Sequence, residues 1–148
     1  MSVEAIAIVG LYPSIVWKRF YEISQVPRPS KSEERIRLFL RNFAGQNNFD
    51  FREDETGNIV ILVPPTPGCE NKPTVVIQNH VDMVCEKNKG TEHDFMKDPI
   101  ELVRDGDWIT ANGTTLGADN GIGAAAALAI ATEHDFEHGP LELLFTVD

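Results

Sequence analysis

The sequence lacks several features that would point to common functional classes. It has 13 basic residues against 23 acidic ones, a formal net charge of −10, which argues against non-specific binding to nucleic acid or to anionic lipid, because such binding requires a basic face. It contains no G-x-S-x-G sequence, so the nucleophile elbow of the α/β-hydrolases is absent. We therefore expect neither nucleic acid nor a membrane among its partners.

Cysteines are also scarce. The two that are present, Cys69 and Cys85, form no C-x-x-C pair, which excludes a disulfide framework and a cysteine-rich structural zinc site. A reducing compartment such as the cytoplasm is the simplest location for such a chain. The first 13 residues include Glu4, have no basic segment and hold only a short apolar stretch, so they predict neither a secretion signal nor a membrane span.

What remains has the composition of a globular domain. A chain of 148 residues, 42% of them hydrophobic, is large enough to bury a core without disulfides. Apolar periodicity and turn residues predict three helices, two hairpins and two buried strands. They cover residues 13–24, 30–43 and 121–134 (helices), 49–65 and 100–111 (hairpins), and 73–84 and 140–148 (strands). This order predicts an α/β fold, a mixed β-sheet with helices on both faces.

Three local patterns refine this fold. Ser30 and Glu33 have the spacing of a capping box, so Ser30 is expected to cap the second helix. The run 73–84 is apolar on both faces, which is typical of a strand inside a sheet. The run 140–148 is another buried strand, and no residues follow that could form helices to cover it. We therefore expect residues 1–148 to be the N-terminal part of a longer protein.

His80 and Asp82 stand at the end of the predicted strand, in QNHVDMV (78–84). Side chains at positions i and i+2 of an extended chain point to the same face, so the carboxylate can accept one ring N–H and leave the other nitrogen free. Carboxylates orient metal-ligating histidines in this way. The pattern is short, however, and it fits a hydrogen-bonded histidine beside a turn aspartate equally well.

Asp119 lies among glycines in TTLGADNGIGAAAALAIA (114–131), directly before an almost wholly apolar helix. A carboxylate at a helix N-terminus is stabilised by the helix dipole and can serve as the cap. Asn120 can take the capping role instead, which would leave Asp119 free to bind a cation. The glycines on either side permit close approach of other groups. The sequence leaves Asp119 as either a helix cap or a rigidly held metal ligand.

The same glycines support a competing interpretation. Residues 121–126, GIGAAA, fit the dinucleotide fingerprint G-x-G-x-x-A through Gly121 and Gly123. That motif should follow a strand directly, which it does not do here, and Asp119 would repel a pyrophosphate. A nucleotide-binding α/β domain stays an alternative, as does an inert truncated module that self-associates through exposed strand edges.

Three stretches taken together resemble one enzyme family: NHVDMV (79–84), HDFMKDPI (93–100) and GTTLGADNGIG (113–123). From about Trp17 onward the chain resembles the aminoacyl-histidine dipeptidases, also called carnosine-type dipeptidases, of the co-catalytic zinc peptidase clan. The resemblance implies a hydrolase that cleaves Xaa-His dipeptides with two divalent metal ions, zinc being the expected metal. It also implies a cytoplasmic enzyme that is a homodimer at full length.

The resemblance further implies roles for three residues. His80 would ligate one ion, Asp119 would bridge both, and Asp82 would act in catalysis by holding the His80 ring. The Asp119–Asn120 peptide bond is expected to be cis. The family's general base, its remaining ligands and its lid domain would follow Asp148. The 148 residues, as the N-terminal part of the catalytic domain, are therefore expected to bind zinc weakly and to be inactive alone.

Overall fold

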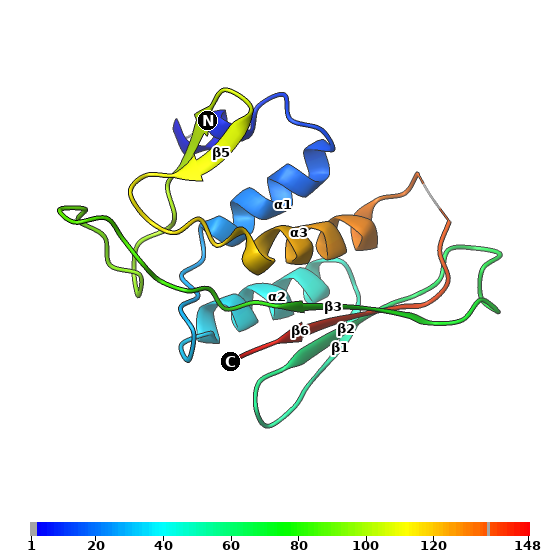
Figure 1. The fold of residues 1–148 in the computed structure, drawn as a ribbon. Helices are drawn as coiled ribbons and strands as arrows, with labels where there is room; N and C mark the ends of the chain where they lie inside the picture. Colours follow the sequence, from blue (N-terminus) through cyan, green and yellow to red (C-terminus); the bar gives the residue numbers. More distant parts are fainter. Residues whose placement is uncertain (1–2, 136) are drawn as a thin grey trace.

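A four-stranded sheet with helices packed on it forms the centre of the molecule (Figure 1). The computed structural model describes residues 3–135 and 137–148. In chain order its elements are η1 (Val3–Ile8), α1 (Ser14–Ser24), α2 (Glu34–Gln46), β1 (Asp50–Glu53), β2 (Ile59–Val63), β3 (Val75–His80), β4 (Leu102–Asp105), β5 (Trp108–Ala111), α3 (Ala118–Thr132) and β6 (Leu141–Thr146). The predicted helices, hairpins and strands are all present, with ends shifted by a few residues.

The sheet is mixed, with strand order β1-β2-β6-β3. β2 is antiparallel to both β1 and β6, whereas β3 is parallel to β6. Along β2 and β6 buried residues alternate with half-buried ones, and Ile59 faces Phe145 while Ile61 faces Leu143 in the register. These apolar side chains form one continuous buried face. The predicted mixed α/β class is confirmed.

The apolar helix α3 lies between α1 and the sheet (Figure 1). Its alanines allow close approach on several sides, and Ala124, Ala125 and Leu128 are all buried. α2 packs beside it, over β1 and β2. The lack of a polar face on α3 is therefore explained by its place in the centre of the core.

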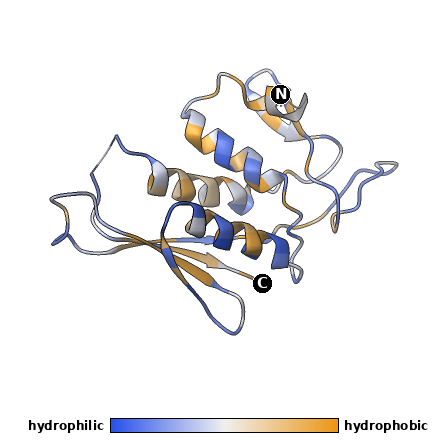
Figure 2. Cartoon of the chain, turned by 180° about the vertical axis from the view of Figure 1, so that it is seen from behind, coloured by the Kyte–Doolittle hydropathy of each residue, from blue (hydrophilic) through white to orange (hydrophobic). Residues whose placement is uncertain are grey.

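The three helices lie on one side of the sheet, where the sequence led us to expect helices on both. Figure 2 shows the same arrangement from behind. Ile61 and Leu143 are fully buried, whereas Val60 and Leu144, at alternate positions of the same strands, are half-buried. A crossover between parallel strands places its helix on one face, and the described chain has a single such unit, β3–α3–β6. This rule places α3, and α1 and α2 lie on the same side of the sheet as α3.

β3 also differs from its prediction as an inner strand. Within the described residues it pairs with β6 alone, and Val76 is 55% exposed. The inner-strand prediction is thus not met within the described residues, since an apolar run shows that a strand can be buried, not which strands lie beside it. β4 and β5 form a separate hairpin beside η1. In the part of the chain described here, no helix combines the length and apolarity needed to span a membrane.

Candidate metal centre

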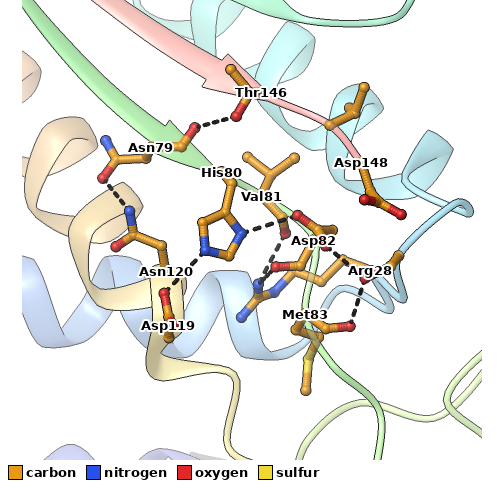
Figure 3. Close-up of polar contacts among 12 residues, drawn as sticks. Arg28, Asn79, His80, Val81, Asp82, Met83, Asp119, Asn120, Thr146 and Asp148 are labelled. Atoms are coloured by element: carbon orange, nitrogen blue, oxygen red, sulfur yellow. Dashed lines mark hydrogen bonds and ion pairs between the residues drawn. The ribbon is translucent and has the colours of Figure 1, made fainter.

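His80 is the last residue of β3, at the edge where the parallel strands β3 and β6 both end. Its Nδ1 lies 3.0 Å from Asp82 Oδ1, and its Nε2 lies 3.0 Å from Asp119 Oδ1 (Figure 3). The i, i+2 relation between His80 and Asp82 therefore has the predicted result. If Nδ1 carries the proton and donates it to Asp82, the lone pair of Nε2 points toward Asp119.

Asp119 enters the site from the N-terminal end of α3. Gly117 precedes it in the left-handed conformation, at φ 72°, and no side chain caps the helix. Asp119 and Asn120 depart from helical backbone angles, and the peptide bond between them is cis, as the resemblance implied. The Asp119 side chain is 96% exposed. The helix-cap interpretation of Asp119 is therefore wrong, and its carboxylate is open to solvent beside an imidazole.

Asn120 does not cap the helix either. Its amide donates to Asn79 Oδ1 at 3.0 Å, which ties the start of α3 to β3 (Figure 3). A Cβ added at Gly123 would collide with the side chains of both asparagines. A Cβ at Gly121 would lie 2.7 Å from Arg28 Nη2. The space beside Gly121 and Gly123, the two glycines of the supposed dinucleotide fingerprint, is thus filled by other side chains of this protein.

The electrostatics of the site follow from these contacts. Partial burial lowers the pKa of His80, but hydrogen bonds and charge from Asp119 and Asp82 outweigh it and raise that pKa overall. Burial raises the pKa of Asp82, and the hydrogen bonds from Ser30 and His80 outweigh it, so the net pKa is lowered. Two carboxylates thus surround one imidazole, a set of groups that favours positive charge at the position of Nε2.

Ser30 is a member of the site that the sequence did not reveal. Its hydroxyl donates to Asp82 Oδ2 at 2.6 Å, while α2 begins only at Glu34. The predicted capping box was therefore wrong, because the charged acceptor on Asp82 replaces the helix as partner of the serine. Glu33 Oε1 instead accepts hydrogen bonds from the backbone N–H groups of Lys31 and Asp148.

Arg28 was also missed, since the sequence QVPRPS was interpreted only as a helix break. Its side chain is 2% exposed, and its guanidinium donates to the backbone carbonyls of Val81 and Asp82 (Figure 3). It also donates to the backbone carbonyl of Gly117. A basic residue between two prolines gives no local signal of such contacts. Only the tertiary structure shows that it touches both segments that carry the candidate ligands.

His80 and Asp119 supply two donors of types that zinc accepts, an imidazole nitrogen and a carboxylate oxygen. Within residues 3–135 and 137–148, no group of three or more His, Cys, Asp or Glu side chains is arranged to hold a metal ion. The structure thus brings the predicted residues together as a pair of donors plus the orienting Asp82. Their roles as ligands stay a prediction.

Comparisons with known proteins bear on the resemblance. No family profile matches the chain. A cytosol non-specific dipeptidase of Escherichia coli is 47% identical over 137 residues, which is 93% of this chain and 28% of that enzyme. The solved structure of the aminoacylhistidine dipeptidase from Vibrio alginolyticus is 50% identical and superposes with a TM-score of 0.92 over 95% of this chain and 29% of that one. The resemblance to the aminoacyl-histidine dipeptidases is confirmed.

A more distant structure shares the fold. A tripeptidase from Staphylococcus aureus is 23% identical and has a TM-score of 0.72 over 90% of this chain and 36% of that enzyme. The Escherichia coli and Vibrio alginolyticus proteins are both named dipeptidases, while the tripeptidase supports the fold. The chain spans less than a third of the length of the two dipeptidases it matches.

Proposed function

We propose that this chain provides part of the active site of a metal-dependent dipeptidase. The observation that carries the proposal is the contact of His80 Nε2 with Asp119 Oδ1 at 3.0 Å, with Nδ1 held by Asp82. It occurs in a chain that is 50% identical to an aminoacylhistidine dipeptidase. His80 would ligate one divalent ion, and Asp119, whose carboxylate is exposed, would bridge two.

The chemistry of the pair fits this assignment. Zinc binds neutral imidazole nitrogen and carboxylate oxygen, and a carboxylate on the second ring nitrogen fixes the tautomer and raises the basicity of the ligand. Asp82 is itself held by Ser30, so the His80 ring has one preferred orientation. When bound, divalent cations supply Lewis acidity toward a carbonyl and acidify water.

The substrate and the context are proposed from the relatives. A dipeptide, including the Xaa-His type, is the proposed substrate, because the two most similar proteins reported above are named dipeptidases. We place residues 1–148 in the N-terminal part of the catalytic domain, and the general base and further ligands in the rest of a longer, homodimeric, cytoplasmic enzyme. The 148 residues by themselves are then inactive, and they bind zinc weakly, because catalytic sites usually have three protein ligands.

Zinc titration by calorimetry tests the proposal. We expect weak uptake by the unaltered chain, and none after His80→Ala or Asp119→Ala. The exposed His134 provides the matched control, since His134→Ala removes an imidazole that follows the C-terminal end of α3, the end opposite to the site. Tight binding of zinc that survives His80→Ala would refute the assignment of the ligands. Hydrolysis of carnosine-like dipeptides by the 148-residue chain with added zinc would refute its expected inactivity.

A further inference from the structure

Arg28 joins the two segments that carry the candidate ligands. It lies in the loop between α1 and α2, and its Nη1 donates to Val81 O at 2.9 Å and to Asp82 O at 3.3 Å. Its Nη2 donates to Gly117 O at 2.6 Å. One planar group is thus hydrogen-bonded to the backbone directly after His80 and to the backbone just before Asp119.

The backbone around Arg28 is fixed on the His80 side. Met83 N–H donates to Arg28 O at 3.0 Å, and Pro29 forms a parallel bridge with Met83. Ser30 adds its hydroxyl bond to Asp82. The loop is therefore attached to residues 82 and 83 through one isolated bridge and these hydrogen bonds, and the guanidinium of Arg28 reaches across to the segment of Asp119.

The site is built for a guanidinium in particular. Arg28 is buried, and in the residues that the structure describes its Nε has no hydrogen-bond partner. Burial lowers its pKa to about 10, against the opposing charge of Asp82, so the group stays protonated at neutral pH. The hydrogen bonds of Nη1 and Nη2 offset the burial of this cation, and an ammonium group lacks the planar fork that donates in two directions.

Two glycines make room for this group. A Cβ on Gly117 would lie 2.6 Å from Arg28 Nη2, and one on Gly121 would lie 2.7 Å from the same atom. Gly117 also has a positive φ, so two independent constraints favour glycine there. The start of α3 is therefore shaped around the guanidinium.

We propose that Arg28 is a positioning residue that sets the spacing between His80 and Asp119. The expected effect on metal binding rests on the proposed function, whereas the hydrogen bonds of Arg28 to the two segments do not. Arg28 touches neither the imidazole nor the Asp119 carboxylate. It acts through the carbonyls of Val81 and Gly117. Its loss removes the link closest to both candidate ligands along the backbone, while the Asn120–Asn79 and Thr115–Val84 hydrogen bonds remain.

Hydrogen exchange on the metal-free chain tests the geometry. The amides of Val81 and Met83 report on one segment and that of Gly121 on the other, since each is hydrogen-bonded in the structure. With Arg28→Met we expect exchange at least ~10-fold faster in both segments, because local opening requires less free energy once the bridge is lost. Arg35→Met, on the exposed face of α2, is the control and leaves these amides unchanged.

Hydrogen exchange in the Arg28 variants can overturn this bridge between the two segments. A folded Arg28→Met chain with unchanged exchange at Gly121, or with faster exchange in one segment only, overturns the bridge. If Arg28→Met does not fold, Arg28→Lys serves instead. There we expect faster exchange at Gly121 with the fold retained, and exchange as slow as in the unaltered chain overturns the inference.

Zinc titration of the same variants tests the consequence. Arg28→Met should weaken zinc binding by about 10- to 100-fold relative to Arg35→Met, the usual effect of losing a group that orients a ligand. Zinc affinity equal to that of the control would overturn the positioning role. If the unaltered chain takes up no zinc, the proposed function fails, while hydrogen exchange still decides whether Arg28 joins the segments.

Discussion

The crowding around Gly121 predicts opposite effects for two glycine-to-alanine substitutions. Gly121 lies in the first turns of α3, where a Cβ would be 2.7 Å from Arg28 Nη2 and 3.2 Å from Phe20 Cε2. Gly45, near the end of α2, would place a Cβ in open space, with nothing within 4 Å. Neither glycine has a positive φ, so alanine is compatible with the backbone at both positions.

The expected magnitudes follow from these surroundings. Alanine is favoured over glycine in a helix by up to about 1 kcal/mol, so Gly45→Ala should raise the free energy of unfolding by about 0.5–1 kcal/mol. At Gly121 the same gain is opposed by overpacking, which costs about 1–3 kcal/mol. Phe20 and Arg28 are both buried and have no solvent to move into. We therefore expect Gly121→Ala to be less stable than Gly45→Ala by about 1–3 kcal/mol.

Urea unfolding followed by circular dichroism measures this difference. A double-mutant cycle with Arg28→Ala adds the decisive control, because removing the guanidinium should relieve the clash and produce a coupling of about 0.5–3 kcal/mol. Should Gly121→Ala prove as stabilising as Gly45→Ala, the packing of Arg28 against the helix start would be refuted. The result also separates the two explanations of Gly121, since a glycine kept small for a phosphate would accept a Cβ in the free protein.

Two further predictions concern stability away from the site. Burial raises the pKa of Glu53, but hydrogen bonds from Arg37 and Arg41 outweigh it and lower that pKa overall. The carboxylate therefore stabilises the fold above its unfolded pKa of about 4.3. This contribution is lost as the pH falls through the folded pKa. By urea unfolding, Glu53→Gln should thus be less stable than the unaltered chain at pH 7, and the difference should shrink as the pH falls through the folded pKa. A difference that does not shrink in acid would contradict the ion pairs. Leu143→Ala, in the fully buried face of β6, should lower the free energy of unfolding by about 2–5 kcal/mol. Leu38→Ala, on an exposed part of α2, should change it by about 0.5 kcal/mol or less, and similar losses in both would show that β6 is not in the core.

The elements and half of the site could be predicted from local sequence patterns. Helix α3 was identifiable because its run of alanine, leucine and isoleucine can be buried on every side, and the structure places it between α1 and the sheet. His80 and Asp82 were identifiable as a unit because the period of an extended chain is two residues. Both inferences depend only on geometry within a short segment.

Arg28 and Ser30 could not be found in this way, because their roles depend on partners more than fifty residues away along the chain. Ser30 shows how a local rule fails. Its spacing from Glu33 fits a capping box, yet its hydroxyl donates to the carboxylate of Asp82, which tertiary structure brings close. A hydrogen bond to a charged carboxylate is stronger than one between neutral groups. The strands that pair with β3 could not be predicted for the same reason, since strand neighbours are set by topology and not by composition.

The meeting of His80 with Asp119 is itself a consequence of topology. β3 and β6 are parallel, so the chain must travel back along the sheet between them, and it does so as α3. A helix that returns in this way begins at the edge where the first strand ends, which brings residue 80 and the start of α3 together (Figure 1). The segment from 81 to 117, with its β4–β5 hairpin, lengthens the connection without changing this juxtaposition. The fold therefore provides the meeting point, and the identities of two residues, an imidazole and a carboxylate, determine the chemistry that can occur there.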